Sequence, residues 1–363
     1  MRTAGCARSM KVLALTKYGD LAASTRQRFL QYRPALAEAG IELRCSALFD
    51  NHYLAHVLAG EPAPAGTIVR AYLRRLVGLI EATSADLVWL HCEFFPYWPG
   101  FTETLAATAI RKPIVFDFDD AIFHMYDANA RPMVRLLLSG KLKGLLSRVR
   151  ACTCGNAYLR DYAARFCSKS IIVPTVVDTD AYRPVTRQED APLTIGWIGS
   201  PTTWRGVEPL LPVLHDICSE YQARFLVIGA GQAANRDVFP GMELRDWSEA
   251  TEIGDVQAMD IGIMPLLDRP FERGKSGYKL IQYMACGLPA IASPIGVNAQ
   301  IVKDGVNGFL ASTEHEWRKA LAALLDSAPL RTRLGSQGRD KVVREFSLSS
   351  QKARLIDLFK SLA

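Results

Sequence analysis

GKSGYKLIQYMACGLPAIASPIG (274–296) is the segment that reveals most about the fold. It begins with a glycine-containing loop, continues as an amphipathic helix and ends in a short apolar strand. Ser276 is expected to cap the amino terminus of the helix, and Gly287 followed by Pro289 is expected to end it. A loop, a helix and a buried strand in this order are typical of one unit of a parallel α/β sheet.

One face of this helix is polar and suits an anion. Lys275, Lys279 and Gln282 are spaced i, i+4, i+7 and therefore share one side of the helix. Free backbone amides and the helix dipole add to the attraction for negative charge at the amino terminus. Gly274 and Gly277 would let phosphate oxygens approach the backbone closely. The segment therefore predicts a diphosphate-binding site.

The same alternation of apolar runs and helical patterns extends from this segment to both ends of the chain. It predicts parallel sheets covered by helices on both faces. The expected strands are 11–17, 41–48, 86–92, 113–119, 150–155 and 170–176, and then 193–199, 223–229, 242–247, 261–266, 290–294 and 308–311. One of the expected helices covers 26–39 and is closed by Gly40.

We therefore predict an α/β chain with two doubly wound Rossmann-like domains that face each other across a cleft. The first domain is expected over 1–184 and the second over 193–346, joined by a polar, proline-flanked linker at 185–192. A final amphipathic helix over 347–363 is expected to pack back on the first domain. Residues 1–9 could be a ragged beginning rather than part of the native protein.

The tail of the opening segment resembles a known signature. MACGLPAIAS (284–293) and IGVNAQIVKDGVNGFL (295–310) resemble stretches of family-4-type retaining glycosyltransferases of GT-B fold, the glycosyl transferases group 1. That family has two glutamates where this chain has Gly274 and Gln282, and uses them on the donor sugar and the ribose. The resemblance implies that Gln282 contacts the ribose and that Glu272 takes over the other contact.

A second stretch, GWIGSPTTWRGVEPLL (196–211), resembles the strand, loop and helix that open the donor domain of this family. Arg205 keeps a cation for the diphosphate, whereas Ser200 replaces a second one, which Lys275 or Lys279 would supply. The position of Trp247 is where the family receives the nucleotide base. Trp247 could equally be a core residue.

The first half resembles the family more loosely. The resemblance places Gly19 in the first loop near the donor, and Asp119 and Asp120 where relatives carry a His-Asp pair that faces the transferred sugar. Two arginines, Arg26 and Arg28, begin the next helix, where cations oppose the helix dipole. We expect them, together with His124, on the donor-phosphate or acceptor side, the alternative being exposed arginines without function.

Charge and composition narrow the setting. The net charge is +6, and the excess of basic residues lies before residue 191. Residues 128–150 carry six basic residues and no acidic one, interleaved with leucines. This pattern predicts a basic amphipathic helix on an anionic membrane surface, or a solvated helix with its leucines in the core. No leader or spanning segment is recognisable, so we expect a cytoplasmic protein that is peripheral on the inner face of the membrane.

The predicted function is transfer of a hexose from a UDP- or GDP-linked sugar to a glycan, lipid-linked or small-molecule acceptor, with retention. Arg205 and Lys279 are expected to stabilise the leaving diphosphate, and Asp119 and Asp120 to act at the sugar. No cofactor, metal ion or nucleic acid is expected, and Cys152 with Cys154 is a poor zinc site.

Three alternatives remain at this stage. The replaced glutamates are compatible with a sugar-nucleotide-binding protein of impaired activity. A nucleotide-sugar epimerase of the same fold is a close rival. A remote alternative is a haloacid-dehalogenase-type phosphatase, because IVFDFDDAI (114–122) resembles its D-x-D motif, with Asp117 as nucleophile and Asp119 as general acid.

Overall fold

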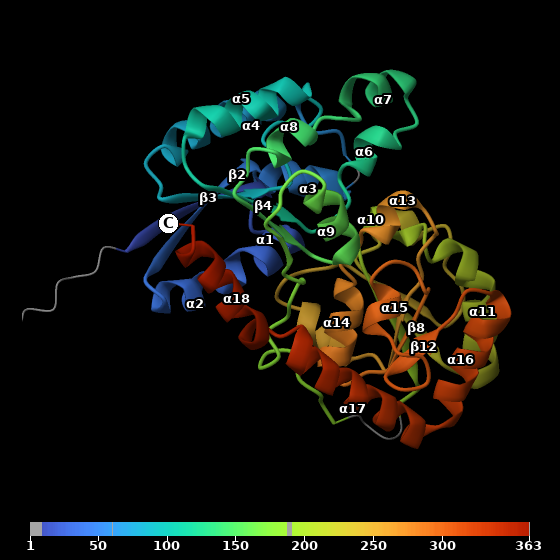
Figure 1. Cartoon of the computed structure of the whole chain (residues 1–363). Coiled ribbons are helices and arrows are strands. Elements are labelled where there is room, and N and C mark those ends of the chain that lie inside the picture. The colour runs from blue at the N-terminus through green and yellow to red at the C-terminus, as the bar shows by residue number, and fades with distance from the viewer. Residues whose placement is uncertain (1–8, 60, 187–190, 363) are drawn as a thin grey trace, which may run out of the picture. The chain divides into compact units, whose positions relative to one another are not determined.

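The computed structural model describes residues 9–59, 61–186 and 191–362, so half of the expected linker (187–190) and residues 1–8 of the N-terminal stretch 1–9 lie outside the described residues. The chain divides into two compact units (Figure 1). We call Met1–Ala55, Pro62–Pro174 and Gln351–Ala363 unit 1, and His56–Glu61 and Thr175–Ser350 unit 2.

Unit 1 contains a six-stranded parallel sheet in the order β2-β1-β3-β4-β5-β6. Its strands are β1 (Met10–Tyr18), β2 (Ile41–Phe49), β3 (Leu87–His91), β4 (Ile114–Phe118), β5 (Ala151–Cys154) and β6 (Ser170–Ile172). Strands β3, β4 and β5 are buried along their whole length, which explains their mostly apolar sequence. The six strands expected in this half are confirmed.

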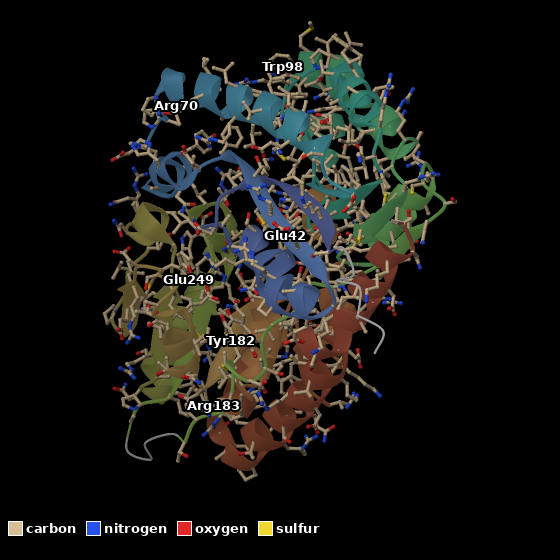
Figure 2. The ribbon with its side chains drawn as sticks, turned by 90° about the vertical axis from the view of Figure 1, so that its left-hand side faces the viewer. Glu42, Arg70, Trp98, Tyr182, Arg183 and Glu249 are labelled. Carbon is tan, nitrogen blue, oxygen red and sulfur yellow. The ribbon has the colours of Figure 1, made fainter. Side chains whose placement is uncertain are left out.

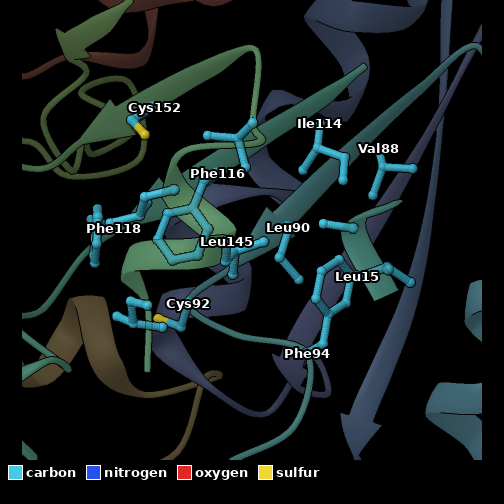
Figure 3. Packing of buried hydrophobic residues seen from close by; sticks show 14 of the residues in the cluster. Leu15, Val88, Leu90, Cys92, Phe94, Ile114, Phe116, Phe118, Leu145 and Cys152 are labelled. Atoms are coloured by element: carbon cyan, nitrogen blue, oxygen red, sulfur yellow. The ribbon is translucent and has the colours of Figure 1, made fainter. Parts of the chain in front are cut away.

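Helices cover this sheet and join its strands. They are α1 (Ala23–Arg28), α2 (Arg33–Glu38), α3 (Asn51–Ala59), α4 (Ala65–Ala82), α5 (Gly100–Ile110), α6 (His124–Asp127), α7 (Pro132–Leu138), α8 (Lys143–Leu146), α9 (Ala157–Ala164) and α18 (Leu348–Lys360). Figure 3 shows the core between sheet and helices, where Phe116 and Phe118 of β4 meet Leu90 of β3 and Leu145 of α8.

Two helix predictions in this unit are wrong. The helix expected over 26–39 is broken into α1, a 3-10 turn (Leu30–Tyr32) and α2. Pro34 stands in the first turn of α2 and lacks an amide hydrogen, so a continuous helix would lose a hydrogen bond there. The basic helix expected over 128–150 is two short helices, α7 and α8, with Gly140 between them.

The last helix, α18, packs on unit 1 although it ends the chain. Phe359 contacts Trp89 of β3 with ring centroids 5.1 Å apart. Arg354 Nη1 donates to the carbonyl oxygen of Ile172 in β6 at 2.7 Å. Figure 1 shows α18 (red) beside α2 (blue). Residues from the two ends of the sequence therefore complete one compact unit.

Unit 2 repeats the architecture with a parallel sheet in the order β12-β11-β10-β7-β8-β9. Its strands are β7 (Thr194–Ile198), β8 (Arg224–Ile228), β9 (Met242–Arg245), β10 (Ile261–Met264), β11 (Ala290–Ala292) and β12 (Gly308–Leu310). Its α-helices are α10 (Pro201–Trp204), α11 (Leu211–Tyr221), α12 (Glu252–Gln257), α13 (Pro270–Arg273), α14 (Tyr278–Ala285), α15 (Asn298–Ile301), α16 (Glu314–Asp326) and α17 (Ala328–Glu345). The six strands expected here are confirmed too.

Because the order runs outward on both sides of β7 and β10, the direction of winding reverses between these two strands. Ligands of open parallel sheets bind at the carboxyl ends of strands near such a reversal. The loops after β7 and β10 are therefore the place to look for a site. None of the helices in the described part of the chain has the length and hydropathy of a membrane span.

Candidate functional site

The turn after β7 is tight and fixed by hydrogen bonds. The amide of Ser200 donates to Thr203 Oγ1 at 3.0 Å, and Thr203 Oγ1 donates to the carbonyl oxygen of Ser200 at 2.9 Å. A Cβ atom on Gly199 would lie 2.4 Å from the Trp197 ring and 2.7 Å from Thr203 Oγ1, so only glycine fits. The turn is a preformed backbone loop at a strand end.

One cation reaches this turn from another helix, and a second follows it in the sequence. Lys279 extends from α14, with Nζ 3.4 Å from Thr203 Oγ1 and 4.8 Å from the centroid of the Trp197 ring. Arg205 directly follows α10 and is exposed. The structure thus brings Ser200 and Lys279 together with the end of α10, as the sequence predicted from two separate segments.

Helix α14 begins one residue later than expected. Its N-cap is Gly277, in the left-handed region at φ 71°, and Ser276 lies before it. Ser276 is therefore not the capping residue. A Cβ atom on Gly277 would lie 2.4 Å from Ile301 Cδ1, so the loop packs too closely on α15 for any side chain. The predicted end is confirmed, because Gly287 takes a left-handed conformation directly after the helix.

The loop before α14 offers a carboxylate and an amine. The amide of Lys275 donates to the carbonyl oxygen of Glu272 at 3.1 Å, and Lys275 Nζ lies 4.8 Å from the centroid of the Phe271 ring. Within the described residues, Glu272 Oε2 is buried and has no hydrogen-bond partner. An unsatisfied buried carboxylate oxygen is costly, so a hydroxyl from a ligand would stabilise it.

A buried network that the sequence did not reveal centres on Glu252 of α12. Its carboxylate accepts from Trp247 Nε1 at 2.6 Å and from Gln282 Nε2 at 3.0 Å, and it also accepts from the hydroxyl of Tyr182. Burial and the Glu252 carboxylate raise the pKa of Tyr182 well above its ordinary value. The amide of Gln282, expected on the ribose, is therefore also bound inside the protein.

The network adjoins the turn after β7. A Cβ atom on Gly229, at the end of β8, would lie 2.5 Å from the carbonyl oxygen of Gly199 and 3.0 Å from Trp247 Cβ. Gln282 lies one turn after Lys279 on α14. The phosphate-side and base-side candidates of unit 2 thus form one continuous set at the carboxyl ends of β7, β8 and β9.

In unit 1, Arg28 and Asp117 form a buried bidentate ion pair. Arg28 Nε and Nη2 lie 2.9 and 2.6 Å from the two carboxylate oxygens of Asp117, and Thr153 Oγ1 donates to Oδ1 at 2.5 Å. Arg28 also donates to the carbonyl oxygen of Val173 at 2.6 Å. The side chain of Arg28 is only 3% exposed, so the alternative of an exposed arginine is wrong for Arg28.

Asp119 and Asp120 follow β4 and are half-buried. Asp119 Oδ1 lies 3.0 Å from His91 Nε2 and accepts from Cys92 Sγ at 3.5 Å. Burial alone would raise the pKa of Asp119, but His91 and Arg28 outweigh it and hold the pKa below its ordinary value. His91 and Cys92, which the sequence did not reveal, come close enough with Asp119 to hold a metal ion, since their ligand atoms lie within 4.8 Å of one another.

The other candidates of unit 1 are engaged locally. Arg26 Nη1 donates to the carbonyl oxygens of Asp20 and Leu21 at 3.1 and 2.8 Å, and so braces the loop that begins at Gly19. The ring nitrogens of His124 lie 2.7 Å from Asp127 Oδ1 and 2.7 Å from the hydroxyl of Tyr158.

A buried charge cluster fixes the loop after β3. Lys141 Nζ lies 2.6 Å from Glu93 Oε2 and 3.2 Å from Glu103 Oε1, and all three side chains are fully buried. The hydroxyl of Tyr126 donates to Glu93 Oε2 at 2.6 Å, and Lys17 Nζ lies 3.5 Å from Glu93 Oε1. Lys141 belongs to the basic segment 128–150, so one of its six cations serves the core rather than a surface.

A protein-family model matches part of unit 2. Residues 192–327 match the family model of glycosyl transferases group 1. No curated protein matches the chain significantly. The match lies in unit 2, where the candidate cations and the Glu252 network were found.

Solved structures match the whole chain. The Anabaena protein Alr3699/HepE, in complex with UDP and glucose, has 15% sequence identity and a TM-score of 0.71, over 97% of this chain and 100% of its own. Sucrose-phosphate synthase of Thermosynechococcus elongatus has 15% identity and a TM-score of 0.74, over 97% and 99%. A glycosyltransferase of Rickettsia africae has 13% identity and a TM-score of 0.69, over 98% of both chains. The fold is therefore that of GT-B glycosyltransferases, as predicted.

Proposed function

We propose that this protein is a glycosyltransferase that moves a hexose from a UDP-linked donor to a glycan or lipid-linked acceptor. The observation that carries the proposal is the meeting of Lys279 with the Ser200–Thr203 turn at the carboxyl end of β7. A cation beside a preformed backbone turn at the reversal of a parallel sheet suits a diphosphate. The choice of UDP is supported by the similar Anabaena structure, which is a complex with UDP and glucose.

The chemical task of unit 2 is to stabilise the leaving diphosphate. As the bond between sugar and phosphate breaks, negative charge grows on the phosphate oxygens. Lys279 and Arg205 supply positive charge, and the amides around Ser276 and Gly277 supply hydrogen bonds. The proposed transfer proceeds with retention and needs no metal ion for this step.

Other residues of unit 2 orient the donor. Trp247 borders the turn through Gly229 and is proposed to contact the base, and Gln282 is proposed to contact the ribose. The buried Glu272 oxygen suits a sugar hydroxyl, and Lys275 adds charge on the phosphate side.

In unit 1, Asp119 is proposed to act on the sugar or acceptor as an ionised carboxylate. Its lowered pKa keeps it deprotonated near neutral pH, so it can accept a proton or a hydrogen bond but cannot serve as an acid. Asp120 and His124 are proposed to line the acceptor side. Arg26 and Arg28 act indirectly, by holding the first loop and Asp117.

A sugar-nucleotide-binding protein of impaired activity is the second candidate. It is favoured by one observation, the engagement of the Gln282 amide by Glu252 and Tyr182. The phosphatase alternative is disfavoured, because both oxygens of Asp117 are held by Arg28 in a buried pair.

A thermal-shift screen with UDP, GDP and their sugars tests the proposal. UDP should raise the melting temperature more than GDP, since a ligand that binds the folded state stabilises it. No shift with any nucleotide would sink the proposal. Donor hydrolysis or transfer then separates an enzyme from a binding protein, and isomerisation of the free sugar nucleotide without acceptor would indicate an epimerase.

We keep the membrane contact of 128–150 as a proposal, although the segment forms two short helices instead of one. Helix α7 within it exposes Met133, Leu136 and Leu137 rather than burying them in a core. A lipid-linked acceptor would require the protein to work at a membrane surface. Such a surface would need more exposed apolar area than α7 alone provides.

A further inference from the structure

Helix α4 is apolar on its outer side as well as its inner side. Its inner side buries Ala71, Arg75 and Ala82. Its outer side exposes Ile68, Val69, Leu73, Leu76, Val77 and Ile80, with Ile80 72% exposed. Positions 69, 73, 76 and 80 are spaced by four, three and four residues, so they form one continuous stripe along the helix. A helix of a soluble unit ordinarily places polar residues on this side.

The apolar stripe continues onto the neighbouring loop and helix. Trp98 stacks on Tyr72 of α4 and on Phe95, with ring centroids 5.4 and 5.5 Å apart, and stays half-exposed. Phe101 and Leu105, one turn apart on α5, are 70% and 66% exposed. Figure 2 shows α4 along the outside of unit 1 with Arg70 near its start, and Trp98 on the same side. We call these exposed residues of α4, Trp98, Phe101 and Leu105 the α4–α5 surface.

The exposed charges of this part of the chain are mostly positive. Among residues 65–150 the exposed acidic residues are Glu81 and Asp127. The exposed basic residues are Arg70, Arg111, Arg131, Arg135, Lys143, Arg148 and Arg150. Arg70 near the start of α4 and Glu81 near its end stand on the same helix, and Lys143 begins α8, which packs closely against α5 through Gly144 and Thr104.

We propose that the α4–α5 surface docks on an anionic lipid membrane. Exposed aliphatic side chains would enter the boundary between headgroups and acyl chains, and a tryptophan held by two aromatic neighbours suits the interfacial layer. Basic side chains around them would be attracted to anionic headgroups. Apolar side chains that can insert, together with neighbouring basic residues, are what a peripheral membrane surface needs.

The alternative occupant is a second copy of the chain. The stripe on α4 alone would suit a helix-to-helix contact. However, the apolar residues continue over a loop and a second helix, and in a symmetric dimer both copies would bring the positive charges of Arg70 and Lys143 to the contact. Charge complementarity therefore favours an anionic surface over a second copy.

This inference deepens the proposed function, because it names the membrane as the place of the acceptor, but it does not depend on transfer. The test is flotation of the full chain with vesicles, without donor. Vesicles of phosphatidylglycerol and phosphatidylcholine in equal parts are compared with pure phosphatidylcholine. We expect binding to the anionic vesicles, weakened by salt and much weaker on the neutral ones.

The decisive variant is the triple change Leu73→Gln, Leu76→Gln and Ile80→Gln. These side chains are exposed, so their replacement should leave the fold intact. We expect at least a tenfold loss of vesicle binding, with the thermal shift by UDP unchanged. The matched control is Val238→Gln with Val343→Gln, which removes exposed apolar side chains from unit 2 and should bind vesicles like the parent chain.

Three results would overturn the proposal. The first is failure of the parent chain to bind anionic vesicles, and the second is equal binding by the triple variant. The third is a dimer of the parent chain, seen by sedimentation equilibrium, that the triple variant dissociates. Because UDP binding is measured separately, failure on vesicles would leave the transferase proposal intact, and failure with nucleotides would leave the membrane surface intact.

Discussion

The two units differ in the partners that surround their cationic side chains. In unit 1, Arg28 is bound by both oxygens of Asp117, and Lys141 lies against Glu93 and Glu103, all in the interior. In unit 2, Arg205 is exposed, and Lys279 lies against a hydroxyl and an indole ring at the end of β7. Cations paired with buried carboxylates serve the fold, whereas we propose that the cations near the turn after β7 meet a ligand.

This comparison separates stability from activity. Removing a charge from the strand ends of unit 1 should unfold the protein more easily, because its partner is left buried and unpaired. Removing a cation near the turn after β7 in unit 2 should reduce turnover and leave stability nearly unchanged. Variants in each unit can break that separation.

The largest effect is expected from Asp117→Asn. The change keeps the shape of the side chain but leaves the buried Arg28 guanidinium without its counterion. Breaking a buried pair costs about 3–5 kcal/mol, which should lower the melting temperature by about 10 °C or more. Asp119→Asn, two residues along the chain and half-buried, is the matched control and should cost less. Equal losses in both variants would show that the Arg28 pair has no special place in the fold.

Turnover is expected to fall at least tenfold in Arg205→Ala and in Lys279→Ala, with melting temperatures close to that of the parent chain. Each change removes a positive charge that is proposed to stabilise the leaving diphosphate. The loss of transition-state stabilisation should be a few kcal/mol at most. Donor hydrolysis or transfer measures it. Arg236→Ala, which removes another exposed arginine of unit 2, is the control. Near-parent rates in both site variants would contradict the assignment of the phosphate side.

Sequence patterns predicted the fold well because they depend on burial. A strand covered on both faces is mostly apolar, so strands such as β3, β7 and β10 were visible as apolar runs. The break between α1 and α2 was missed, although Pro34 marked it, because helical periodicity continued across it. The start of α14 was missed because Gly277 caps through its backbone conformation, while Ser276 offered the more usual side chain.

The site was predictable only where its residues lie close in sequence. Lys279 and Gln282 stand on one helix, and Arg205 lies just after the turn that follows β7. Glu252 is thirty residues from Gln282 and only the packing of α12 and α14 brings them together. His91 ends β3 and Asp119 follows β4, so the pairing of these two strands brings them together. Whether Arg28 points outward or inward was likewise undecidable from its position at a helix start.

Acid should destabilise the protein through unit 1. Burial would raise the pKa of Glu93, but Lys141 and Lys17 hold it below 4.5, and the pKa of Asp119 is below 3.8. A carboxyl with a lowered pKa contributes stability that is full above its ordinary pKa and is lost as the pH falls through the folded value. Glu103 opposes this, since burial raises its pKa, so it favours the folded state as pH falls.

We therefore expect the melting temperature to be nearly constant from about pH 7 to about pH 5, and to fall by several degrees below that. Asp119→Asn should remove its own share of the acid slope and keep the share of Glu93. A melting temperature that rose on acidification below pH 4.5 would mean that Glu103 outweighs the other two groups.

The smallest effect, and the one that tests the continuity of the unit 2 site, is expected from Glu252→Gln. The neutral amide still accepts from Trp247, but it loses the charge that strengthens its bonds to Gln282 and Tyr182. Hydrogen bonds to a charged group are worth about 1 kcal/mol more than neutral ones, so the KM for the donor should rise about fivefold. Turnover at saturation should hardly change, because Glu252 positions the groups proposed for base and ribose and does not touch the phosphates. Asp255→Asn removes a charge from the same helix, where the carboxylate pairs with Arg245 at 2.9 Å, and should leave the KM unchanged. A lower melting temperature with an unchanged KM in Glu252→Gln would show that the network only holds unit 2 together, and the donor site would then end at the turn after β7.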